Sequence, residues 1–172
     1  MFGIKFVNRP IWVACLAVAA LQAGSVATAA ADVAFYDAAL CKPPYSLDTA
    51  TALYEAAEKL AKPDTSGLGA AIYKLPHQIG RDGFKSDEVL FAGSAVGVLI
   101  EGQRADELAA KYDLSPETRD LMGTSSKGYA RELTSDLQPE EGLAGPGKVF
   151  IVAREGNALN GKTLLACEFI VD

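Results

Sequence analysis

The chain has 172 residues, a net charge of −6 and 49% hydrophobic residues, which is the composition of an ordinary globular protein. An acidic chain repels phosphate backbones and anionic lipid headgroups, so nucleic acid and an anionic membrane surface are disfavoured as partners. A basic protein or a cationic ligand is compatible with this charge.

The first 31 residues have the form of a secretory signal peptide, with basic residues, then an apolar stretch, then small residues suited to cleavage. The apolar stretch is shorter than the roughly 20 residues of a membrane-spanning helix, so we expect cleavage rather than an uncleaved anchor. The signal consists of Lys5 and Arg9, the apolar run 11–23, and the cleavage motifs Ala27-Thr28-Ala29 and Ala29-Ala30-Ala31.

Cleavage leaves residues 32–172, and these 141 residues have the size of one domain with its own core. Loss of Lys5 and Arg9 takes the net charge from −6 to −8. We therefore expect a periplasmic or secreted protein that does not insert into a membrane after the signal is removed.

Two cysteines, Cys41 and Cys167, remain after the expected cleavage. In an oxidising compartment, two cysteines near opposite ends of a domain most simply form one disulfide. The alternative, a metal site built on both thiolates, lacks further ligands because the chain has one histidine. We predict a Cys41–Cys167 disulfide, with no metal and no cofactor.

The first predicted element of the mature chain with a clear pattern is a helix. Ser46 or Asp48 can cap it, apolar residues follow at three- and four-residue spacing, and Pro63 ends it. A short strand is predicted over 70–75. Gly80-Arg81-Asp82-Gly83 then predicts a hairpin turn, because Asp-Gly accepts the positive φ angles of tight turns.

The longest apolar run of the expected mature chain spans residues 87–100, and we expect it at the centre of a sheet. Its β-branched and aromatic residues favour a strand, while Gly93 and Gly97 indicate a bend, a bulge or a close backbone approach. We interpret the run as one bent strand, with two strands joined near Gly93-Ser94 as the alternative. If the two glycines leave space beneath a helix, a ligand cavity lies there.

Beyond this run the pattern is less regular. It predicts a helix over 105–112, a further short helix starting at Ser115-Pro116, and a polar loop over 124–128. Residues 129–137 are ambiguous between strand and helix. No internal repeat is evident.

The chain ends on two apolar, β-branched runs, 148–154 and 162–171, which predict a hairpin. Asn160-Gly161 favours a two-residue turn, with a longer loop as the alternative. Because hairpins link the strands, we predict an α+β fold: a mainly antiparallel sheet of about five strands, two or three helices on one face, a single domain and one disulfide.

Two stretches resemble nucleotide- or DNA-binding motifs, and each lacks a required feature. Residues 142–148 have P-loop spacing, but Val149 replaces the magnesium-binding Ser or Thr, and a strand follows instead of a helix. Residues 107–122 resemble a helix-turn-helix, but Glu117 and Asp120 stand where basic or polar readers belong. We predict no nucleic-acid partner.

Ser126 and His77 are candidate residues for hydrolysis. Ser126 stands beside Lys127 in a segment that only loosely resembles the Ser-x-x-Lys motif of penicillin-recognising enzymes, whose partner motifs are missing. His77 is the one side chain that titrates near neutrality without perturbation, and no nucleophile motif accompanies it.

We therefore expect a small acidic binding or interaction module that recognises a protein partner or a small ligand. A small exported hydrolase using Ser126 or His77 is the alternative, and no catalytic residue is assigned. The candidate recognition residues are His77, Arg81 and Asp82 at the hairpin, and Gly93 and Gly97 in the apolar run.

Overall fold

The computed structural model describes residues 34–117, 125–139 and 146–171, so the predicted signal peptide lies outside the described residues. The described chain forms one eight-stranded sheet in the order β1-β2-β3-β4-β8-β7-β6-β5, and every pairing in it is antiparallel. The predicted α+β class with an antiparallel sheet is confirmed. The predicted number of about five strands is wrong.

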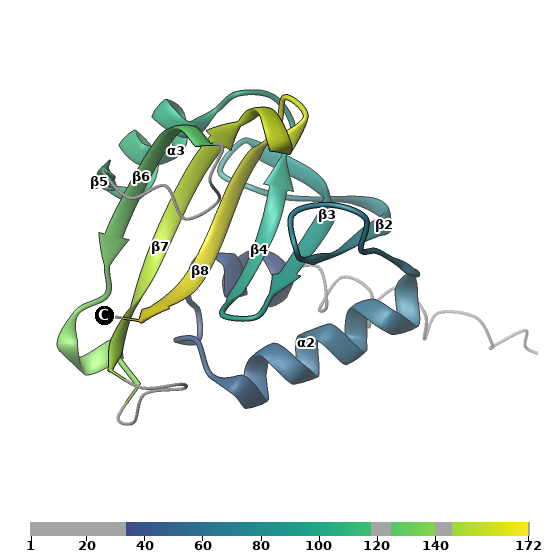
Figure 1. Ribbon diagram of the computed structural model, residues 1–172, viewed down its shortest axis with the longest axis horizontal. Helices are drawn as coiled ribbons and strands as arrows, with labels where there is room; N and C mark the ends of the chain where they lie inside the picture. Colours follow the sequence, from purple (N-terminus) through teal and green to yellow (C-terminus); the bar gives the residue numbers. More distant parts are fainter. Residues whose placement is uncertain (1–33, 118–124, 140–145, 172) are drawn as a thin grey trace, which may run out of the picture.

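The elements fall into two halves of similar order (Figure 1). The first half consists of α2 (Leu47–Leu60), β1 (Pro63–Asp64), β2 (Ala71–Arg81), β3 (Phe84–Ala92) and β4 (Ala95–Ile100). The second half consists of α3 (Ala105–Tyr112), β5 (Ser115–Pro116), β6 (Ser125–Glu132), β7 (Gly147–Gly156) and β8 (Thr163–Val171). Two 3₁₀ turns, η1 (Ser135–Leu137) and η2 (Asn157–Leu159), lie in the second half, and residues 34–39 form a helix before α2.

The two halves share one architecture, a helix followed by a four-stranded meander. Their last strands, β4 and β8, pair at the centre of the sheet, and their two-residue first strands lie at its two edges. Each first strand follows its helix closely and contains a proline that precedes an acidic residue, as Pro63-Asp64 and Pro116-Glu117. The backbone therefore has an internal repeat that the sequence did not reveal.

The two long helices are capped in different ways. The Ser46 hydroxyl accepts the backbone N–H of Thr49 at 3.2 Å, and the Thr49 hydroxyl accepts that of Ser46, which completes a capping box at the predicted start of α2. At the start of α3 the carboxylate of Glu155, on β7, accepts the backbone N–H of Ala105 at 2.6 Å. A side chain from a distant strand thus replaces the local cap that Arg104 does not provide.

The predicted turn residues adopt the backbone angles that motivated the prediction. Asp82 and Gly83 have φ of 57° and 88°, and they join β2 to β3 in a two-residue turn. Asn160 and Gly161 have φ of 52° and 78°, but η2 precedes them, so the connection is the longer loop.

Three other predictions are corrected. The run 87–100 is two strands joined at Gly93-Ser94, because Ala92 pairs with Ala95, so the single bent strand is wrong. Residues 115–116 form an edge strand paired with β6 and not the first turn of a helix, while residues 118–122 of the predicted helix lie outside the described residues. Residues 125–128 belong to β6 rather than to a polar loop, because pairing with β7 outweighs their weak strand propensity.

All three helices contribute to one buried cluster on one face of the sheet, as predicted. Phe91 lies near its centre, with its ring edge-on to those of Phe35, Tyr54 and Tyr73. The helix-bearing face therefore forms the main hydrophobic core.

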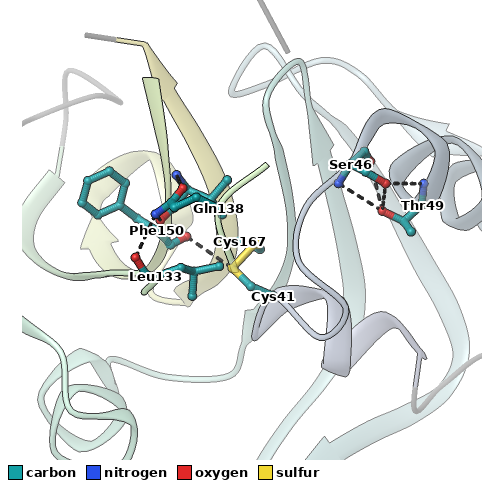
Figure 2. Close-up of a disulfide and its surroundings, with 8 residues drawn as sticks. Cys41, Ser46, Thr49, Leu133, Gln138, Phe150 and Cys167 are labelled. Atoms are coloured by element: carbon teal, nitrogen blue, oxygen red, sulfur yellow. Dashed lines mark hydrogen bonds between the residues drawn. A yellow bond between two sulfur atoms is a disulfide. The ribbon is translucent and has the colours of Figure 1, made fainter. Parts of the chain in front are cut away.

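The predicted disulfide is confirmed: Cys41 and Cys167 are bonded, with their Cα atoms 5.0 Å apart (Figure 2). It ties the segment after the first helix to β8 on the helix-bearing face. The Cys41 sulfur also lies 3.6 Å from the Phe150 carbonyl oxygen, as a contact only, since a bonded sulfur has no hydrogen to donate. Nearby, the Gln138 side chain receives the N–H of Val149 and donates to the Leu133 carbonyl.

The opposite face carries no α-helix in the described part of the chain, yet its centre is also apolar and buried. Side chains from β3, β4, β7 and β8 form a second cluster, onto which η2 and the loop before β2 pack. The central members are Leu90, Leu99, Val152, Leu164 and Ala166. Over the described residues, none of the helices is long and apolar enough to cross a membrane.

Candidate functional site

A cavity of about 270 Å³ lies on the helix-free face. Of the described residues that form its wall, all are apolar except two charged ones, Arg154 of β7 and Glu168 of β8. Small-molecule sites commonly combine such an apolar wall with a few converging polar groups. The apolar lining consists of Leu68, Ala70, Leu90, Ala92, Ala95, Leu164 and Ala166.

Arg154 binds two carboxylates at once. Its Nε and one terminal nitrogen each lie 2.8 Å from an oxygen of Glu117, which is a bidentate pair. Its other terminal nitrogen lies 2.7 Å from Glu168 Oε2. The exposed fractions are 1% for the Arg154 side chain, 3% for Glu117 and 15% for Glu168, so Glu168 is the most exposed of the three.

The electrostatics keep Arg154 charged in this apolar setting. Burial on its own lowers the pKa of Arg154, but the hydrogen bonds and charges of Glu117 and Glu168 outweigh it and hold the pKa above its ordinary value. Withdrawing such ions from water costs several kcal/mol per ion, which well-placed partners only roughly offset. A contribution to stability therefore does not by itself explain why these three charged side chains are buried together.

A second hollow of about 260 Å³ adjoins the first, and Leu68 lines both. Its rim carries the ion pair of Lys162 with Glu88, whose charged atoms are 2.5 Å apart. Leu68 has φ of 60°, a left-handed conformation that is uncommon for a bulky residue. It separates the Arg154 cavity from a rim that is rich in lysine.

Gly93 borders a third cleft, of about 320 Å³, between the start of α2 and the β3–β4 turn. The sequence analysis considered a ligand cavity beneath a helix at Gly93, and ligand binding in this cleft stays a prediction. None of the described residues that line it is charged, in contrast to the Arg154 cavity. The lining is Tyr45, Leu47, Ala50, Thr51, Tyr54, Phe91, Ala92, Gly93, Ala95 and Val96.

Gly97 does not border that cleft. A Cβ atom at this position would lie 2.8 Å from both the Ala166 Cβ and the Leu165 carbonyl oxygen, so β4 and β8 approach each other too closely for a side chain. The predicted cavity at Gly97 is wrong, and the prediction of a close backbone approach is confirmed there.

The predicted hairpin tip is tied to the helices. Arg81 forms an ion pair with Asp37 of the first helix. Asp82 accepts the Tyr112 hydroxyl at 3.1 Å and lies 3.4 Å from the Lys111 ammonium, both on α3. His77 is exposed and lies on β2, the same strand as Arg81.

The structure brings together no hydrolytic pair from the predicted residues. Ser126 lies on β6, its side chain outside the described part, and four strands separate it from His77 on β2. The Lys127 ammonium lies 2.6 Å from the Asp106 carboxylate, which raises the pKa of Lys127. A lysine held in its protonated form is a poor base for activating a hydroxyl.

The other two motifs fall partly outside the described residues, which exclude 142–145 of the P-loop spacing and 118–122 of the helix-turn-helix stretch. Lys148 lies in β7 and its side chain forms an ion pair with Glu132, and residues 115–116 form strand β5. Within the described ranges, no group of three or more His, Cys, Asp or Glu residues could hold a metal ion.

The sequence analysis did not single out Arg154 or Glu168, and it noted Glu117 only as an obstacle to DNA binding. A signal was present, because Glu168 interrupts a run of apolar strand residues and Arg154 directly follows one. Charged residues in such runs are buried only when they are paired. Comparison with protein-family models, curated proteins and solved structures gave no match.

Proposed function

We propose that this chain is an exported binding protein that takes a small ligand into the Arg154 cavity on the helix-free face. The observation that carries this proposal is the buried trio of Arg154, Glu117 and Glu168, of which Arg154 and Glu168 line a largely apolar cavity. Export is supported by the signal-like sequence of residues 1–31 and by the Cys41–Cys167 disulfide, which suits an oxidising compartment.

A small ligand is favoured over a protein strand that would extend the sheet. Edge strands resist such pairing when they are short, bulged or contain proline. The outermost strands β1 and β5 have two residues each. Next to β1, strand β2 carries Pro76 within an irregularity between Lys74 and Ile79.

The test uses three eight-carbon probes that differ in the charge of the head group, namely octylammonium, octanoate and octanol, titrated into the mature protein by calorimetry. At least one should bind with 1:1 stoichiometry. Ala70→Phe, which fills the Arg154 cavity, should weaken that binding at least tenfold, while Ala50→Phe in the Gly93 cleft should leave it within twofold.

Both variants must keep the melting temperature of the parent protein. Binding that is lost in Ala50→Phe and kept in Ala70→Phe would move the site to the Gly93 cleft. Absence of binding by all three probes would refute the proposal.

A further inference from the structure

Tyr45 contributes a buried phenol to the wall of the Gly93 cleft. The residue is 6% exposed, and burial raises the pKa of its hydroxyl, so the phenol is uncharged at neutral pH. Within the described part of the chain this hydroxyl forms no hydrogen bond, and it is not one of the polar atoms that are enclosed completely without a partner. Buried phenols usually have a hydrogen-bond partner, as donor or acceptor. The cleft therefore holds a hydrogen-bonding group that a ligand can use.

The backbone on both sides of Tyr45 is held in place. Four residues before it, Cys41 is bonded to Cys167 of β8, and directly after it Ser46 forms the capping box of α2 with Thr49 (Figure 2). A group that is already fixed in position loses little conformational freedom when a ligand binds it. The Tyr45 phenol is thus preorganised.

The cleft also has aromatic walls. Phe91 and Tyr54 both line it, and their rings are 5.5 Å apart and inclined by 81°. Phe91 makes the same edge-on contact with Phe35 and with Tyr73. Aromatic rings prefer this arrangement, which stabilises them beyond the burial of their area. A ring that enters the cleft can extend the pattern, whereas a saturated body cannot.

The charge and the size of the cleft restrict the ligand further. None of the described lining residues is charged, so a charged ligand would leave water without a counter-charge. The volume of about 320 Å³ lies near the lower end of the roughly 300–1,000 Å³ of small-molecule sites. Since a cavity of about 150 Å³ holds benzene, this space suits one or two rings.

We infer that the Gly93 cleft is a second binding site, for a neutral aromatic molecule of one or two rings that hydrogen-bonds to the Tyr45 hydroxyl. This site does not depend on the proposed function, because it lies beneath α2 and the Arg154 cavity lies on the helix-free face. Ala92 and Ala95 line both spaces, so a test that separates them needs residues that line only one.

The first experiment titrates three probes with the same carbon skeleton into the unaltered mature protein by calorimetry. The probes are 2-naphthalenemethanol, 2-naphthoate and the saturated decahydro-2-naphthalenemethanol. The aromatic alcohol should bind with 1:1 stoichiometry, about tenfold or more tighter than the anion and about threefold or more tighter than the saturated alcohol. Absence of binding by the aromatic alcohol, or equal affinity for either of the other two, would overturn the inference.

Two variants locate the bound alcohol. Ala50→Phe, which fills the cleft, should weaken binding of 2-naphthalenemethanol at least tenfold, while Ala70→Phe in the Arg154 cavity should leave it within twofold. The opposite pattern would overturn the cleft as its site.

Tyr45→Phe tests the assigned hydrogen bond and keeps the ring that packs in the core. It should weaken 2-naphthalenemethanol about three- to tenfold and leave 2-methylnaphthalene, which has no hydroxyl, within twofold. Tyr129→Phe is the matched control: it removes a hydroxyl that hydrogen-bonds to Asp106, away from the cleft, and it should change neither affinity. Full affinity for the alcohol in Tyr45→Phe would overturn the assigned contact.

The two proposals succeed or fail separately. The eight-carbon probes and Ala70→Phe decide the Arg154 cavity, whereas the naphthalene probes, Ala50→Phe and Tyr45→Phe decide the cleft. Failure of the aromatic alcohol to bind would overturn the cleft site and leave the proposed function as it stands.

Discussion

Among the charged residues of the described chain, Arg154 is the most deeply buried. Arg154 lies on β7, on the same face of the sheet as the buried apolar residue Val152, and its side chain is 1% exposed. Truncating one member of a buried ionic group is costly because the remaining charges lose their partner. Replacing the whole group by apolar residues often leaves stability unchanged. Comparing a single substitution with replacement of the whole group therefore separates an effect on stability from an effect on binding.

We predict that Arg154→Met lowers the free energy of unfolding by about 3 kcal/mol or more, because Glu117 is left buried without its counter-ion. The triple variant Arg154→Met, Glu117→Leu and Glu168→Leu should regain most of that stability and lose binding of the eight-carbon probe that the parent protein binds. Urea unfolding and calorimetry measure the two quantities. A triple variant as unstable as Arg154→Met would show that the trio is needed to hold the fold.

At the scale of an element, polar contacts hold the β2–β3 hairpin against the helices. Its turn is held between two helices, through Arg81 to Asp37 and through Asp82 to Tyr112 and Lys111. Burial, then the neighbouring Tyr36 hydroxyl and the Asp82 carboxylate, raise the pKa of Tyr112 well above its ordinary value of 10.0. The folded protein therefore keeps this phenol neutral at a pH where the unfolded chain ionises it.

This raised pKa predicts a loss of stability in alkali. The contribution of Tyr112 is fully present below pH 10 and is lost as the pH rises above 10 toward the folded pKa. The loss is up to about 1.4 kcal/mol per pH unit, and less to the extent that solvent reaches the group.

Tyr112→Phe should lose about 1 kcal/mol at pH 7, because the hydrogen bond to Asp82 is gone. Its free energy of unfolding should then fall less steeply than that of the parent between pH 10 and 11. Urea titrations at pH 8, 10 and 11 provide the comparison. Parallel pH dependence of the two proteins would contradict the role of Tyr112.

Elements specified by neighbouring residues could be predicted from the sequence, and those specified by distant residues could not. The Ser46 cap and the Asp82-Gly83 turn depend on residues a few positions apart, so local patterns found them. The α3 cap comes from Glu155, 50 positions away. Edge strand β5 is defined by its pairing with β6, and the hydrophobic periodicity of a segment does not indicate such pairing.

The candidate site depends almost entirely on such long-range relations. Glu117 and Arg154 are 37 positions apart, and the fold brings them together on one face of the sheet. Of the residues singled out for recognition, Gly93 borders a cleft, while Arg81 and Asp82 stabilise the hairpin. Sequence spacing alone could not distinguish Gly93, which borders a cleft, from Gly97, where the lack of a side chain lets β4 approach β8 closely.

At the scale of the whole molecule, the strand pairing that joins the two halves in the described sheet is that of β4 with β8, and Gly97 lies opposite Ala166 in this central pairing. A methyl group at Gly97 would meet the Ala166 Cβ and the Leu165 carbonyl oxygen, each at 2.8 Å. Because backbone atoms are among these neighbours, a rotamer change cannot relieve the overlap. The strands would have to separate at the junction of the halves.

Gly97→Ala should therefore lower the free energy of unfolding by about 1–3 kcal/mol through overpacking. Gly93→Ala is the matched control, because a Cβ there meets no atom within 4 Å and neither glycine has a positive φ. It should be neutral or stabilise by up to about 1 kcal/mol, since alanine restricts the unfolded chain. Chemical unfolding of both variants measures the difference, and equal effects would contradict the close approach of β4 to β8 as the reason for glycine at position 97.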